Sequence, residues 1–230
     1  MNYKMKFEQF LEFLETYHGR DKILRLFCYT CKLISGLSKS DKLNKIYYHL
    51  NECRTILRLF DDIPMLSYTL SYGLGKKEPD KYMQICGVVS NILDQLYYPL
   101  EHVAWASDKK LLSVRSDKWW TLSTICWVLS VYFCLIKSLC YLSVIRKHKS
   151  KLEVERNVGI ELAMASRLQL NEILTALRCT SDLIYAIHWL PSGILWSGKL
   201  SDLQVGALGT FSSIISLVQS FYSVTNISME

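Results

Sequence analysis

The chain has 230 residues, of which 50% are apolar and 21% are charged, and its formal net charge is +6. A soluble domain usually carries somewhat more charge than this, and two or three membrane spans of ~20 residues would account for the apolar excess. These proportions exclude a polytopic transporter, a disordered chain and a collagen-like or coiled-coil fibre. With only four prolines and ten glycines, the chain favours long helices over short strands.

Helical periodicity dominates the N-terminal half. Apolar residues recur every three or four positions over 7–17, and a second helix capped by Asp21 is expected to reach about Gly36. A third helix is predicted over 41–60. The segment 82–105 predicts either a helix pair or one kinked helix, because a proline removes a backbone donor within it.

The predicted helix over 41–60 carries the clearest functional pattern. At ~100° per residue, one apolar face covers about half of its circumference and consists of Leu43, Ile46, Tyr47, Leu50, Cys53, Ile56, Leu57 and Phe60. Basic residues border this face, namely Lys42, Lys45, Arg54 and Arg58. We interpret the face as membrane-inserting and the bases as contacts to lipid phosphates, as in an interfacial helix. Packing in the core of a soluble bundle is the alternative interpretation.

Nucleic-acid binding is the competing use of this basic charge. It would require aromatic or arginine side chains projecting from the basic surface itself, whereas the apolar residues here form a separate face. No nucleic acid is therefore expected as a partner.

The second half contains two long uncharged stretches. Residues 119–136 form an eighteen-residue stretch without charge that begins with two tryptophans, and residues 203–229 form one of twenty-seven. Both are predicted to cross a membrane. A charged amphipathic helix is expected over 151–180, and the segment 183–198 is too short and too interrupted to cross, so an interfacial position is expected.

The last uncharged stretch also carries a stripe of small residues. Spaced three or four positions apart, they are Gly206, Gly209, Ser213, Ser216, Ser220 and Ser223. In lipid, such a stripe lets two helices approach closely. We interpret it as a helix-packing face, used either within the molecule, against 119–136, or between copies.

No pattern of catalytic residues is present. The chain contains no glycine-rich phosphate loop, no HExxH, no GxSxG and no spaced carboxylate–histidine set. The eight cysteines lack the paired spacing of a zinc site. We expect no enzyme, no cofactor, no metal and no catalytic residue.

Several short motifs, in order along the chain, resemble the peroxin-eleven family of peroxisomal membrane proteins, and most closely its gamma form. They are Gly19-Arg-Asp-Lys22, Cys53-Arg-Thr-Ile-Leu-Arg-Leu-Phe-Asp-Asp62, Tyr72-Gly-Leu-Gly75, Asp94-Gln-Leu-Tyr-Tyr-Pro-Leu-Glu-His-Val-Ala-Trp-Ala106, Trp119-Trp-Thr-Leu-Ser-Thr124, His188-Trp-Leu-Pro-Ser-Gly-Ile-Leu-Trp-Ser-Gly198 and Gly209-Thr-Phe-Ser-Ser213.

The resemblance implies a multi-pass peroxisomal membrane protein that elongates, curves and divides peroxisomes, with both termini in the cytosol. It also implies an amphipathic helix that remodels the membrane, and it maps that helix onto about Asp41–Phe60. The implied partners are membrane lipids, further copies of the chain and its paralogues, and a dynamin-related fission GTPase with its tail-anchored adaptors.

The expected fold is an all-α, membrane-associated helical bundle with about two transmembrane helices. Residues 1–118 form the amphipathic region at the membrane surface and in the cytosol, 119–145 the first transmembrane segment, 146–182 the charged helix, and 183–230 an interfacial segment plus the second transmembrane segment. Two rival functions remain. One is a pore for small metabolites, suggested by Lys137 and His188 within apolar segments, and the other is a passive adaptor that recruits fission proteins.

Overall fold

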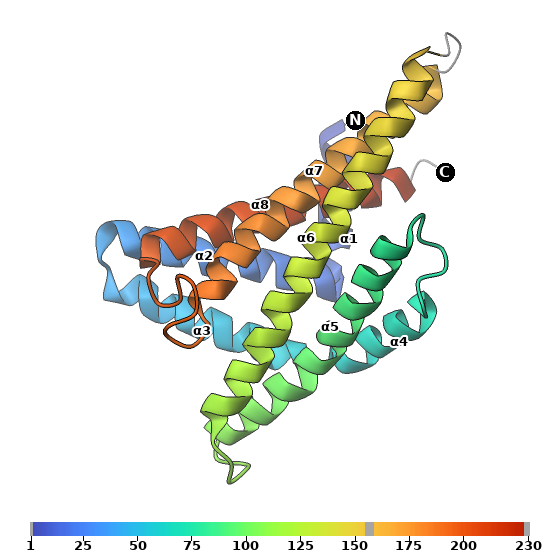
Figure 1. Cartoon of the computed structure of the whole chain (residues 1–230). Helices are drawn as coiled ribbons and strands as arrows, with labels where there is room; N and C mark the ends of the chain where they lie inside the picture. The colour runs from blue at the N-terminus through green and yellow to red at the C-terminus, as the bar shows by residue number, and fades with distance from the viewer. Residues whose placement is uncertain (1, 155–158, 228–230) are drawn as a thin grey trace. The chain divides into compact units, whose positions relative to one another are not determined.

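The structure, a computed structural model, describes residues 2–154 and 159–227, with side chains described over 7–153 and 159–221. The described residues form eight α-helices and no strand, which confirms the all-α prediction (Figure 1). The chain divides into two compact units. Unit 1 comprises Met1–Arg58 and Leu200–Glu230, and unit 2 comprises Leu59–Lys199.

Unit 1 is built around one central helix. Helix α2, Tyr17–Ser38, packs against α1 (Asn2–Glu15), α3 (Asp41–Arg58) and α8 (Asp202–Ile227). The N-terminal and C-terminal parts of the sequence therefore share one core, which explains why unit 1 is discontinuous along the chain.

Helix α2 begins earlier than the sequence pattern indicated. Its N-cap is Thr16, whose hydroxyl accepts a hydrogen bond from the Gly19 amide at 2.9 Å, and Asp21 lies inside the helix. The expected cap at Asp21 is therefore wrong. A threonine hydroxyl satisfies the exposed amides of a first turn as well as an aspartate does, so Asp21 is left for another contact.

Unit 2 contains the other four helices, α4 (Asp62–Tyr72), α5 (Lys81–Asp108), α6 (Ser116–Val154) and α7 (Gly159–His188). Helix α6 packs against both α5 and α7, and α4 packs against α5 (Figure 1). Helix α5 continues through its internal proline as a single helix, which excludes the helix pair among the two expectations for 82–105.

The boundaries around α7 differ from the expected ones. Residues 151–154 still belong to α6, and α7 continues to His188, so it includes the first part of the segment expected to be interfacial. The rest of that segment is a folded loop. The Trp196 indole donates to the Ile184 carbonyl at 2.7 Å, and the Gly198 amide donates to the His188 carbonyl at 3.0 Å.

Two helices within the described residues are long and apolar enough to cross a membrane. They are α6 over Ser116–Glu153 and α8 over Asp202–Phe221, the same two parts of the chain that the uncharged stretches indicated. At 1.5 Å per residue, α6 is roughly 58 Å long, about twice the thickness of a hydrocarbon core. Part of α6 must therefore extend beyond any bilayer that it crosses.

Candidate membrane-binding site

Helix α3 forms where the amphipathic pattern predicted it, and a charged residue stabilises each of its two ends. Asp41 lies in the first turn and Arg58 in the last turn, where each charge is opposite to the partial charge of the helix end. The helix runs antiparallel to α2, because residues near its start contact the end of α2 and residues near its end contact the start.

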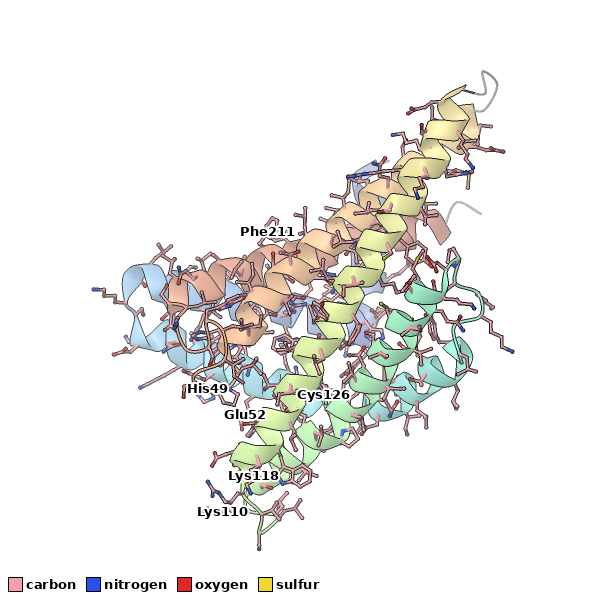
Figure 2. The ribbon with its side chains drawn as sticks, viewed as in Figure 1. His49, Glu52, Lys110, Lys118, Cys126 and Phe211 are labelled. Carbon is pink, nitrogen blue, oxygen red and sulfur yellow. The ribbon has the colours of Figure 1, made fainter. Side chains whose placement is uncertain are left out.

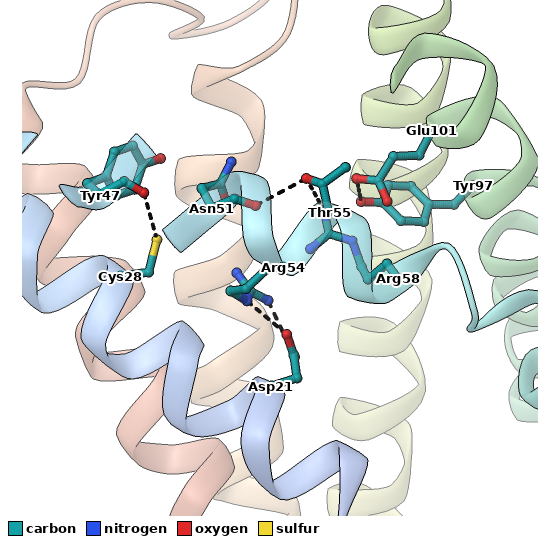
Figure 3. A network of polar contacts seen from close by, with 9 residues as sticks. All are labelled: Asp21, Cys28, Tyr47, Asn51, Arg54, Thr55, Arg58, Tyr97 and Glu101. Carbon is teal, nitrogen blue, oxygen red and sulfur yellow. Dashed lines mark hydrogen bonds and ion pairs between the residues drawn. The ribbon is translucent and has the colours of Figure 1, made fainter. Parts of the chain in front are cut away.

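The face of α3 that packs on α2 is aromatic and polar. Tyr47 and Thr55 are buried, and the Cys28 thiol of α2 donates to the Tyr47 carbonyl at 3.6 Å (Figure 3). Burial raises the pKa of Cys28 to about 11, so this thiol stays protonated and unreactive near neutral pH. Tyr47, expected on the membrane-inserting face, is instead part of the core of unit 1.

Arg54 has a partner that the sequence pattern did not reveal. Its Nε lies 2.9 Å and its Nη2 3.5 Å from the two carboxylate oxygens of Asp21 (Figure 3), and the residue is only 8% exposed. In this arrangement Arg54 joins α3 to α2 and is not free to reach lipid phosphate. Arg58, the other expected phosphate contact on that margin, is half-buried and donates to the Thr55 hydroxyl at 3.2 Å.

The opposite side of α3 presents a stripe of exposed apolar residues, which we call the outer stripe: Ile46, Cys53 and Ile56. Ile46 is 45% and Ile56 is 42% exposed, and Cys53 is exposed as well. Three half-buried leucines border it on one side, Leu43, Leu50 and Leu57. Exposed bases accompany it: at ~100° per residue, Lys42 and His49 lie between Cys53 and Ile56 around the helix, and Lys45 lies just beyond Ile56; His49 is labelled in Figure 2. The expected face is therefore only partly available, and the available part is displaced away from α2.

Phe60, the last residue of the expected face, lies outside the helix. Helix α3 ends at Arg58, and Phe60 follows in the turn with 75% of its surface exposed.

Lys32 is a structural residue that sequence reasoning missed. Only 2% exposed, it pairs with Asp202 of α8 at 2.8 Å, and its ammonium lies 4.5 Å from the centre of the Tyr47 ring of α3. One buried lysine therefore links its own helix α2 to both α8 and α3. A single base at a position that faces the apolar side of α2 was the available signal, but nothing in local spacing identifies Asp202 as its partner.

The small-residue stripe of α8 packs against α2. A Cβ atom added at Gly206 would lie 2.3 Å from the Leu33 amide nitrogen, and one at Gly209 would lie 2.2 Å from the Tyr29 ring. Ser213 is buried on the same side. The stripe is thus a packing face within the molecule, as one interpretation held, but its partner is α2 and not the 119–136 segment.

The remaining members of the stripe continue along the same helix pair. Ser216 is half-buried, its carbonyl accepts from the Ser220 hydroxyl at 2.8 Å, and Lys22 of α2 donates to Ser220. The side chain of Ser223 lies outside the described residues.

Lys137 and His188, the two residues that suggested a pore, take part in contacts within unit 2. The Lys137 ammonium lies 2.7 Å from the Glu78 carboxylate and 3.3 Å from the Tyr72 hydroxyl, while the His188 carbonyl caps the loop after α7. Within 2–154 and 159–227, no three His, Cys, Asp or Glu residues converge to hold a metal ion.

Together, these features define an all-α protein that has, among its described residues, two helices long and apolar enough to cross a membrane and an amphipathic helix, α3, with apolar residues exposed on its outer side. The chain matches the model of the family described as Peroxisomal biogenesis factor 11 (PEX11) over residues 7–221. It therefore belongs to this family of membrane proteins involved in peroxisome biogenesis, which is not a known family of enzymes.

Individual relatives agree with the family match. The chain is 41% identical to the protein named Peroxisomal membrane protein 11C of Homo sapiens over 220 residues, which cover 90% of this chain and 91% of the relative. It is equally similar to the Mus musculus protein of that name over 224 residues, with the same coverage. Peroxisomal membrane protein PMP27 of Saccharomyces cerevisiae (strain ATCC 204508 / S288c) is 24% identical over 126 residues, 52% of each chain. No solved structure matches.

These comparisons confirm the resemblance to the gamma form that the sequence motifs indicated. The names of the relatives support a peroxisomal membrane location for this chain.

Proposed function

We propose that the protein remodels the peroxisomal membrane, elongating and curving it ahead of division, by inserting α3 into the cytosolic leaflet. The observation that carries this proposal is the outer stripe, which leaves Ile46, Cys53 and Ile56 exposed beside leucines and interspersed with bases. An exposed apolar stripe is energetically unfavourable in water. Lysines beside such a stripe are typical of a helix that binds at a lipid interface.

The packing of α3 determines how it would meet the membrane. Helices α3 and α8 each pack antiparallel against α2. The three helix axes are therefore roughly parallel to one another. Helix α3 can lie in the interface plane with its contacts to α2 intact only if unit 1, with α8 included, lies along the membrane surface. In this orientation α8 does not cross the bilayer, unlike the span expected over 203–229. We propose this orientation. Phe221 of α8 lies 4.8 Å from Phe13 of α1, ring centre to ring centre, which supports placing both termini on the same side of the membrane. By family resemblance we propose that this side is the cytosol.

Insertion then acts through area. A helix buried ~5–10 Å deep expands one leaflet only, and many copies side by side would bend the bilayer toward that leaflet. Lys42 and Lys45 would each contribute about 1 kcal/mol of attraction to an anionic surface. Arg54 serves a different purpose, since its pairing with Asp21 fixes the rotation of α3 and so sets which residues face outward.

Crowding of copies requires self-association, and the small-residue stripe is already used within the chain. The opposite side of α8 is exposed and uncharged, with Phe211, Ile214 and Val218 each more than one third exposed (Figure 2 labels Phe211). We place the contacts to further copies and to paralogues on this side. Recruitment of a dynamin-related GTPase and its tail-anchored adaptors is part of the proposal by family resemblance.

Reconstitution of the full chain into anionic liposomes tests the proposal. The wild-type chain should draw the liposomes into tubules, and the Ile46→Glu/Ile56→Glu variant should not, because each carboxylate would have to enter the acyl boundary. Tyr48→Glu is the matched control, since Tyr48 is exposed on the side of α3 away from the outer stripe, and it should tubulate normally.

The same assay separates remodelling from passive recruitment. An adaptor would bind liposomes without tubulating them, and the Ile46→Glu/Ile56→Glu variant would then behave like the wild type. That result would contradict the proposal.

A further inference from the structure

Helix α5 has an exposed apolar side, although the polar and charged residues elsewhere on the helix lower its average hydropathy. Its outward side is apolar over its whole length, at positions three or four apart: Tyr82, Ile85, Val89, Ile92, Leu96, Pro99 and Val103. Tyr82, Ile85, Ile92 and Leu96 are each at least half exposed. No charged residue interrupts this series. From Tyr82 to Val103 it spans about 32 Å at 1.5 Å per residue, which matches the ~30 Å thickness of a hydrocarbon core.

Several polar residues in the middle of α5 lie opposite this outward side, where they contact α6 or one another. The Ser90 and Ser130 hydroxyls lie 3.0 Å apart, and Asp94 accepts a hydrogen bond from Ser130. Glu101 is only 2% exposed and accepts from the Tyr97 hydroxyl at 2.7 Å. Polar groups inside and apolar groups outside is the arrangement of helices packed in lipid. In water, the outward side would be an unexplained apolar surface.

The two ends of the α5–α6 pair carry the groups expected at a membrane boundary. At one end Glu78 of the loop before α5 binds Lys137 of α6, and Tyr72 and Tyr141 hydrogen-bond the same carboxylate. At the other end the Trp120 indole donates to Asp108 at 2.7 Å. Exposed bases lie beyond both ends, and Figure 2 shows Lys110 and Lys118 beside the loop that joins the helices. Aromatic and basic residues are typical of both interfaces.

From these observations we infer that α5 crosses the bilayer beside α6 as the other half of a transmembrane hairpin, with acyl chains as the ligand of its outward side. The occupant is lipid because the neighbouring helix α6 also exposes apolar residues, Leu122, Leu129 and Tyr132, over the stretch long and apolar enough to cross a membrane. Asp94 and Glu101 lower the average hydropathy of α5, but both point away from the lipid.

The inference changes the topology that the sequence predicted. Residues 1–118 were expected to remain outside the membrane, with the chain crossing first at 119–136. A hairpin instead places only the connecting loop, residues 109–115, on the far side. Lys76 and Lys77 before α5 and Lys147 late in α6 then share the near side. This inference does not rest on α3 and would survive failure of the remodelling proposal.

Lysine labelling of the wild-type chain in intact peroxisomes tests the inference without any substitution. A membrane-impermeant amine reagent is applied before or after detergent, and peptides are identified by mass spectrometry. All four reporter lysines, Lys76, Lys77, Lys110 and Lys147, are exposed. The hairpin predicts that Lys76, Lys77 and Lys147 are labelled under the same condition, and that Lys110 shows the opposite detergent dependence.

Two results would overturn the inference. If Lys110 is labelled together with Lys76 and Lys77 while Lys147 behaves oppositely, α6 crosses and α5 does not. If all four are labelled together, neither helix crosses. Proteoliposomes with the chain in one orientation provide the control for the integrity of the organelle membrane.

Discussion

Individual side chains decide which part of α3 is available to lipid. The amphipathic wheel assigned Arg54 to the border of the membrane face, yet a carboxylate 33 residues earlier holds it in the core of unit 1. Periodicity along one helix reports which residues share a side, but not what another helix brings to that side. Lys42 and Lys45, by contrast, remain exposed to solvent.

Exchanging single bases should separate the two roles. Arg54→Ala should lower the free energy of unfolding by about 1–3 kcal/mol, because it leaves Asp21 partly buried without its guanidinium. Lys45→Ala should leave stability within about 0.5 kcal/mol of the wild type but weaken binding to anionic vesicles by about 1 kcal/mol. Thermal unfolding in detergent and vesicle sedimentation measure the two effects. A stable Arg54→Ala variant with impaired vesicle binding would show that this base contacts lipid after all.

The Glu78 carboxylate should make the α5–α6 pair sensitive to acid. Burial raises its pKa, but hydrogen bonds from Lys137, Tyr141 and Tyr72 outweigh burial and leave the pKa below its ordinary value. A carboxylate with a lowered pKa stabilises the fold above its unfolded pKa of about 4.3, and this contribution is lost as the pH falls through the lowered value.

The measurement is the difference in Tm between the wild type and Glu78→Gln. It should be largest near pH 6–7 and shrink as the pH falls below about 4, because the wild-type residue then also becomes neutral. A difference that does not change with pH would mean that the carboxylate charge contributes nothing to this contact.

At the scale of whole helices, the sequence predicted where helices form and whether they are amphipathic or uncharged, but not which helices pack against one another. The uncharged stretches and the third amphipathic helix correspond to α6, α8 and α3. The small-residue stripe lies against α2, a partner that was not foreseen, because a stripe of glycine and serine accepts any helix that approaches closely. Helix α5 was not expected to cross a membrane, since hydropathy averaged along the chain hides the apolar side that lies opposite Asp94 and Glu101.

The contact between α8 and α2 can be tested by adding volume on one side of α8 only. Gly206→Leu should destabilise unit 1 by about 1–3 kcal/mol or prevent its folding, because a side chain there would overlap the backbone of α2 at Leu33. Ala207→Leu adds similar volume at the next position, which is exposed, and should have little effect. Folded yield and thermal unfolding in detergent would compare the two, and equal behaviour would argue against this packing.

At the scale of the molecule, the discontinuous unit 1 could not be derived from the sequence. Local patterns suggest consecutive segments, whereas α8 returns to the N-terminal helices through Lys32–Asp202 and through ring contacts at Phe221. Those contacts connect α3, the helix proposed to insert into the membrane, through α2 to α8. With α5 and α6 as the hairpin, the chain would leave and re-enter the same side of the membrane, which agrees with termini on one side.

The most direct test of the central claim is the depth of α3 in the bilayer. In a full chain whose native cysteines are replaced, a nitroxide is attached to a cysteine introduced by Ile46→Cys or by Tyr48→Cys. In anionic proteoliposomes, the accessibility of each label to oxygen and to a water-soluble nickel complex is compared. The account predicts that the label at Ile46 lies ~5–10 Å below the phosphates, shielded from nickel, while the label at Tyr48 stays in water. Equal exposure of both labels to the nickel complex would contradict it.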